Sequence, residues 1–104
     1  MTDQPYLEKR RGPRIRVSIP VLLIWQEDGE HREHTFTTSV SWFGCAVRTH
    51  RFFPLGARVQ LQRGEKIKDA RVIHCFQDQS TKMVEVGLAF DHDDRAFWGI
   101  LIWT

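Results

Sequence analysis

Apolar residues recur at every second position through several short stretches of this 104-residue chain. The clearest stretch is residues 84–90, in which Val84, Val86, Leu88 and Phe90 alternate with polar or small residues. Because successive side chains of a β-strand point to opposite faces of the sheet, this alternation predicts strands with one buried face. We predict six such strands, over residues 15–25, 35–41, 43–47, 58–62, 67–76 and 84–90.

The alternation also assigns side chains to faces. In residues 35–41 we expect Phe36 and Val40 in the core and Ser39 and Ser41 on the outer face. A second set shares one face of residues 67–76, and this set comprises Ala70, Val72, His74 and Phe76. His74 is expected to be a packed or interfacial histidine and not a catalytic one.

Turn residues separate the predicted strands. Asp28-Gly29 lies in a charged loop, residues 26–33, and this dipeptide is favoured where a hairpin requires positive φ. Pro20 cannot donate a hydrogen bond to a neighbouring strand, so the first strand should carry a bulge or lie at an edge near that residue. Short strands with frequent turns are typical of a small barrel, whose closure leaves few strand edges open.

The C-terminal segment changes its pattern. Residues 91–94 offer a helix N-cap and favourable charge for a first turn, and the apolar spacing of Phe97, Trp98, Ile100 and Leu101 is helical. The predicted fold class is therefore all-β, a six-stranded antiparallel β-barrel with a short C-terminal helix. Because so short a helix cannot cover every aromatic ring, we expect Trp98 and Trp103 to contribute to a docking surface, and a homodimer is one assembly that it would support.

Length and charge limit the classes of protein to consider. The chain fits one domain, with residues 1–9 as a flexible arm and residues 10–104 as the domain. Residues 1–16 carry a net charge of +3 and the remainder −1, so the positive charge is local and does not favour general nucleic-acid binding. No apolar stretch approaches the roughly 20 residues that span a bilayer, so no membrane insertion is expected. Cys45 and Cys75 are interpreted as reduced thiols of a cytoplasmic protein.

No pattern of catalytic or metal-ligating residues is recognisable. No serine or cysteine has the context of an activated nucleophile, so we do not expect an enzyme. His31 and His34 lie close together in the predicted loop, but two histidines without a third ligand do not predict a metal site.

Residues 10–44 combine two features that suit an anion. Arg10 and Arg14 belong to an arginine-dense segment, and the guanidinium fork matches phosphate oxygens and the O6/N7 edge of guanine. One predicted hairpin joins this segment to the serines at 39 and 41 and then to Gly44, where backbone N–H groups can approach a ligand. Together the two features predict an anion site on the hairpin.

These residues resemble the PilZ domain family, whose members bind the bacterial second messenger cyclic di-GMP. The family motif Arg-x-x-x-Arg matches residues 10–14, and the motif Asp/Asn-x-Ser-x-x-Gly aligns with residues 39–44. The stretches Pro54-Leu55-Gly56 and Val86-Gly87-Leu88-Ala89-Phe90 also look like landmarks of the family. The resemblance extends from Lys9 to Phe90 and implies a six-stranded barrel with the ligand held on its outside.

The resemblance also implies roles for individual residues. Arg10 and Arg14 would contact phosphate and guanine with help from Arg11, Ser41 would offer its hydroxyl, and Gly44 would leave room for the ligand. Cyclic di-GMP would be a ligand and not a cofactor. Binding would order the N-terminal arm and change the surface presented to a protein partner, which the sequence does not identify.

Ser39 departs from the family pattern, which has Asp or Asn at that position. A carboxylate can accept two hydrogen bonds from the guanine Watson–Crick edge, and a serine hydroxyl matches that edge less well. Losing one charge-assisted bond costs about 1.5–3 kcal/mol, or tenfold to a hundredfold in affinity. The first alternative is therefore a PilZ-like adaptor that no longer binds the nucleotide. A third interpretation is a small barrel that binds RNA or single-stranded DNA through its arginines.

Overall fold

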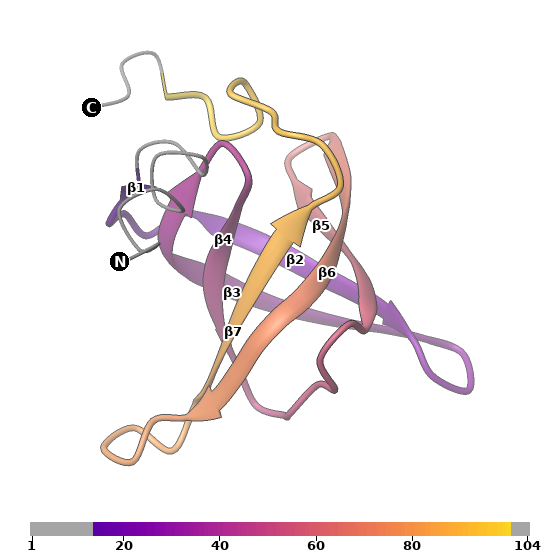
Figure 1. Cartoon of the computed structure of the whole chain (residues 1–104). Coiled ribbons are helices and arrows are strands. Elements are labelled where there is room, and N and C mark those ends of the chain that lie inside the picture. The colour runs from indigo at the N-terminus through magenta and orange to yellow at the C-terminus, as the bar shows by residue number, and fades with distance from the viewer. Residues whose placement is uncertain (1–13, 101–104) are drawn as a thin grey trace, which may run out of the picture.

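The computed structural model describes residues 14–100, and within that range it contains only β-strands as regular secondary structure (Figure 1). All the strand pairings are antiparallel. The strands are β1 (Arg14–Ile15), β2 (Pro20–Gln26), β3 (Glu30–Ser41), β4 (Gly44–Thr49), β5 (Arg58–Arg63), β6 (Lys66–Gln77) and β7 (Val84–Phe90).

The strands close into a barrel because β3 is long enough to pair on both sides. Its first half pairs with β2, while its second half pairs with β1 on one edge and with β4 on the other. The order β3-β2-β5-β6-β7-β4 then returns to β3. The predicted six-stranded antiparallel barrel is confirmed, and β1 is a short additional strand beside β3.

The first predicted strand, residues 15–25, is interrupted before Pro20. Pro20 is the first residue of β2, a position that tolerates the missing N–H. Thr37 connects the interrupted segment to β3: its hydroxyl donates to the Val17 carbonyl at 2.6 Å and accepts from the Ile19 N–H at 2.9 Å. The Thr37 N–H donates to the Ile19 carbonyl at 3.0 Å. A buried side chain thus replaces part of the strand ladder.

We expect Thr37→Val to destabilise the barrel by about 1–3 kcal/mol, because valine has the same shape but leaves the Ile19 N–H and the Val17 carbonyl without this partner. Thr37 is 2% exposed, so water cannot substitute fully. Urea unfolding followed by circular dichroism measures the change. Thr38→Val is the matched control, since the Thr38 hydroxyl makes one longer bond, 3.4 Å to the Ala46 carbonyl. Equal stability of the two variants would show that Thr37 does not anchor the segment.

Two β-bulges reverse faces that strict alternation assigns. The register shifts between Thr37 and Ser39 in β3, and between Val72 and His74 in β6. As a result Phe36 is 57% exposed, although we predicted it in the core, while Val40, beyond the bulge, is buried as predicted. Ser41 lies on the opposite face from Val40, as predicted, but is nevertheless only 3% exposed. Beyond the second bulge, His74 and Phe76 lie on the outer surface and their rings stack on each other, while Cys75 packs against the core.

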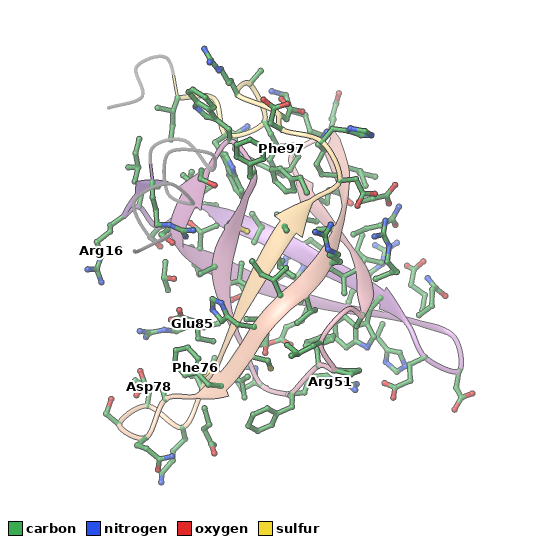
Figure 2. The ribbon with its side chains drawn as sticks, in the orientation of Figure 1. Arg16, Arg51, Phe76, Asp78, Glu85 and Phe97 are labelled. Carbon is green, nitrogen blue, oxygen red and sulfur yellow. The ribbon has the colours of Figure 1, made fainter. Side chains whose placement is uncertain are left out.

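The barrel core consists of inward side chains from β2 to β7, and Phe97 lies at one end of it (Figure 2). Trp98 packs against Phe97 in the same core cluster. The most deeply buried apolar strand residues are Leu23, Val40, Val47, Leu61, Ala70, Val72, Val86 and Leu88.

The predicted C-terminal helix is absent from the described part of the segment, residues 91–100, which forms bends and a turn. The Gly99 N–H donates to the Ala96 carbonyl, and Gly99 has φ of 71°, which ends any helical path. Burial of the Phe97 and Trp98 rings, together with hydrogen bonds from Arg63 and Lys66 to the carbonyls of Phe97 and Ala96, holds this segment, in place of helical hydrogen bonding. Trp98 is 1% exposed and so is not part of a docking surface, while Leu101 and Trp103 lie outside the described residues. No helix within residues 14–100 is long and apolar enough to cross a membrane.

Candidate functional site

The pairing of β1 with β3 brings the two sequence motifs together. Arg14 lies opposite Ser41 in the ladder, and its Nη1 donates a hydrogen bond to the Ser39 hydroxyl at 3.0 Å. The Arg14 side chain is exposed and that of Ser39 is partly exposed, so both can be reached from solvent. The last arginine of the first motif is therefore in contact with the first serine of the second.

Ser41 shapes the turn between β3 and β4. Its hydroxyl accepts a hydrogen bond from the Phe43 N–H at 3.2 Å, and its carbonyl accepts one from Trp98 Nε1 at 3.0 Å. Ser41 is only 3% exposed, although its neighbour Val40 is the residue that points into the core, so the Ser41 side chain is covered on the outer face of the barrel. The side chain thus lies on the expected face but is covered and not open to solvent, and its contact with a ligand stays a prediction.

Gly44 allows two backbones to approach closely. Its φ is 155°, and a Cβ atom at this position would overlap the carbonyl oxygen of Leu88 on β7. Strand packing alone therefore explains why position 44 requires glycine. Whether the missing side chain also leaves room for a ligand stays a prediction.

A pocket of ≈ 380 Å³ opens on the outer surface of the barrel beside this turn. One side is lined by residues near the two motifs, including Arg14, Ser41 and Phe43. The opposite side is lined by residues that sequence reasoning did not connect with the site, including Arg71, His74 and Asp91.

Strand pairing explains why these distant residues share one pocket. The register aligns one lateral row across five strands, and this row runs Arg14, Ser41, Gly44, Ala89 and Arg71. Arg14 and Arg71 flank the small residues of β4 and β7 in this row, and Arg58 of β5 continues the row beyond Arg71. The chain offers one signal for this arrangement, the small residues within the strongly alternating β7, but it does not reveal which residue of β6 lies opposite them.

Asp91 sets the electrostatics at the far side of the pocket. Its Oδ2 accepts a hydrogen bond from Arg58 Nη2 at 2.6 Å, and this bond holds the pKa of the carboxyl below its usual range. Its Oδ1 lies 4.0 Å from Arg71 Nη1, which is beyond hydrogen-bond distance.

Cys45 lines the pocket near Arg14. Burial raises the pKa of its thiol, and the positive charge of Arg14 opposes that shift only in part. The thiol therefore stays neutral at physiological pH and is not an activated nucleophile. Cys45 and Cys75 are both free cysteines.

The remaining predicted features have mixed outcomes. Arg10, Arg11 and the arm of residues 1–9 lie outside the described residues. The predicted loop of residues 26–33 is a tight turn between β2 and β3, with positive φ at Asp28 and Gly29 as expected. His31 and His34 consequently belong to β3. Among residues 14–100, no group of three or more His, Cys, Asp or Glu side chains could hold a metal ion.

Comparison with known proteins identifies the fold. No family model matches the chain, and no curated protein matches it. Among solved structures, the chain is similar to the Inhibitor of motility (MotI/DgrA) of Bacillus subtilis, with a TM-score of 0.64 and 19% sequence identity. The match covers 85% of this chain but only 45% of that one, so the chain spans less than half the length of this structural relative. At this identity the likeness shows a shared six-stranded barrel.

Proposed function

We propose that this chain is a PilZ-type receptor for cyclic di-GMP, as the motif resemblance implies. The observation that carries the proposal is the β1–β3 pairing, which places Arg14 of the first motif in hydrogen-bond contact with Ser39 of the second. Two motifs separated by 24 residues in the chain thereby form one edge of a surface pocket. The shared fold with the Bacillus subtilis Inhibitor of motility supports the same assignment.

Each motif would supply a different part of the recognition. Arg10 and Arg14 would donate paired hydrogen bonds to phosphate oxygens and to the O6/N7 edge of guanine, with Arg11 adding positive charge. Ser39 would give one hydrogen bond where the family has Asp or Asn, and Ser41 would add its hydroxyl after a small rotation. Gly44 would leave room for the ligand, because it adds no side chain to the pocket lining.

The receptor would act on a protein partner in the cytoplasm. The ligand would compete with Ser39 for the donors of Arg14, and residues 1–9 would become ordered around the bound nucleotide. The surface offered to the partner would then change with ligand occupancy. The structural relative is named as an inhibitor of motility, which is a regulatory role.

We expect Arg14→Ala to weaken cyclic di-GMP binding by roughly tenfold to a hundredfold or more, because it removes a charge-assisted donor pair. Isothermal titration calorimetry of the full chain, with GTP as a competing nucleotide, measures the loss. Arg16→Ala is the matched control: it removes the same charge two residues further on, and the Arg16 side chain points away from the barrel (Figure 2).

Saturable binding that Arg14→Ala weakens and Arg16→Ala does not would support the receptor. Equal losses in the two variants would indicate charge attraction without a defined site. Flat titrations of the unmodified chain at high ligand concentration would rule out the receptor and leave the adaptor without ligand.

A further inference from the structure

We propose that Arg71 on β6 is a second ligand-binding arginine, which holds the half of cyclic di-GMP that Arg14 does not reach. This inference rests on the proposed function and adds a residue that neither motif contains. Four points support it: the position of Arg71 in the pocket, its weak pairing with Asp91, the small residues that line the pocket beside it, and the two equivalent halves of the ligand.

The first observation is position. Arg71 lies in the same lateral row as Arg14, separated from it by the strands that contribute Ser41, Gly44 and Ala89. Both arginines line the same pocket, and both side chains are exposed. Two guanidinium groups therefore border one hollow from opposite sides.

The second observation is the difference between Arg71 and its neighbour Arg58. These two residues are directly paired between β5 and β6, and both approach Asp91. Asp91 accepts a hydrogen bond of 2.6 Å from Arg58, whereas Arg71 stands 4.0 Å away. Arg58 is thus committed to the carboxylate, while the planar fork of Arg71 can turn its donors toward an acceptor in the pocket.

The third observation is the space between Arg71 and Arg14. Gly44 and Ala89 lie in the row between the two arginines, and Gly87 lines the pocket beside His74, so all three present little or no side chain to it. The His74 ring lies where a Cβ of Gly87 would stand, so this ring closes the pocket at one side. The surface between the arginines is low enough for a flat ligand to lie against the sheet.

The fourth observation concerns the ligand. Cyclic di-GMP has two guanylate halves, and each half carries one phosphate and one guanine. The motif residues lie on one side of the pocket and serve one half directly. A second arginine on the opposite side can donate to the phosphate or to the O6/N7 edge of the other half. This contact would offset part of the affinity that Ser39 loses relative to Asp or Asn.

Calorimetric titration of the full chain with cyclic di-GMP tests the inference, using Arg71→Ala and the matched control Arg58→Ala. Both substitutions remove one positive charge beside Asp91, but Arg58 does not line the pocket. We expect Arg71→Ala to weaken binding by roughly tenfold or more and Arg58→Ala by less than about threefold. Arg71→Lys should recover only part of the loss, because an ammonium lacks the planar fork.

Thermal unfolding separates a binding role from a structural one. Arg71 is exposed, so Arg71→Ala should leave stability within about 0.5 kcal/mol. Binding by Arg71→Ala that equals that of the unmodified chain, while Arg14→Ala binds weakly, would overturn the role of Arg71 and leave the receptor intact. Equal losses in Arg71→Ala and Arg58→Ala would overturn it as a general charge effect. An unmodified chain that does not bind would overturn the receptor and this inference together.

Discussion

Trp98→Ala is expected to destabilise the barrel by about 3–5 kcal/mol, the usual range for removing a fully buried large aromatic side chain. Trp98 is 1% exposed, and its ring packs edge-on against Phe97 at 4.9 Å and stacks on Phe90 at 6.1 Å. Without the indole, the end of the barrel would contain a cavity that a segment lacking helical hydrogen bonds cannot readily close. Chemical unfolding followed by far-ultraviolet circular dichroism measures the change.

Trp98→Phe separates the packing of Trp98 from its hydrogen bond. Phenylalanine keeps most of the ring contacts but cannot donate to the Ser41 carbonyl, which the indole N–H contacts at 3.0 Å. The expected loss of stability is about 1–3 kcal/mol, the cost of leaving one buried hydrogen-bond partner unsatisfied. A loss under about 1 kcal/mol in Trp98→Ala would contradict the role of this segment as a cover for the core.

Gly44→Ala is expected to damage both stability and binding. The added methyl group would overlap the Leu88 carbonyl, which belongs to the backbone of the neighbouring strand and cannot rotate away. Strain of this kind costs about 1–3 kcal/mol, and the φ of 155° adds to it. Because β4 and β7 must separate, the floor between Arg14 and Arg71 would also shift, and cyclic di-GMP affinity should fall with stability.

Gly29→Ala is the matched control for backbone strain alone. Gly29 also has positive φ, 109°, but a Cβ atom there would have nothing within 4 Å. We therefore expect Gly29→Ala to be less destabilising than Gly44→Ala and to leave binding unchanged. If the two variants lost equal stability, close approach of β4 and β7 would not be the reason for glycine at position 44. Chemical unfolding measures the stability of both variants, and calorimetric titration measures their affinity for cyclic di-GMP.

Alternation predicted the barrel because most of its strands have one face in the core. It worked best in β7, where Val84, Val86, Leu88 and Phe90 are all buried as predicted. It failed at the bulges, where one extra residue reverses the faces beyond it, so Phe36 and Phe76 are exposed. A bulge depends on how the partner strand packs, and the alternation of residues within one strand does not show which strand is its partner.

The prediction of a C-terminal helix was wrong for a different reason. The helical spacing of the segment arises because Phe97 and Trp98 both reach the barrel end, and adjacent residues in a turn can do so without a helix. Gly99, in the left-handed region of φ, marks the change of direction. Tertiary burial outweighed helix propensity here, as it often does in short segments.

The motif side of the site was predictable and the opposite side was not. Arg14 and Ser39 lie at recognisable spacings, and the structure places them in contact. Arg71 lies in a different strand and joins the pocket only through the register of β6 against β7. Its proximity to the motifs is a property of barrel closure, which no local stretch of sequence encodes.

The central claim is that cyclic di-GMP binds in the pocket between Arg14 and Gly44. Titrating the isotope-labelled chain with cyclic di-GMP, while recording backbone amide NMR spectra, locates the contact residue by residue. We expect saturable shifts at Arg14, Ser39 and Gly44, with unchanged amides in the hairpin turn at residues 27–29. Saturable shifts confined to that hairpin, or no shifts at all, would contradict it.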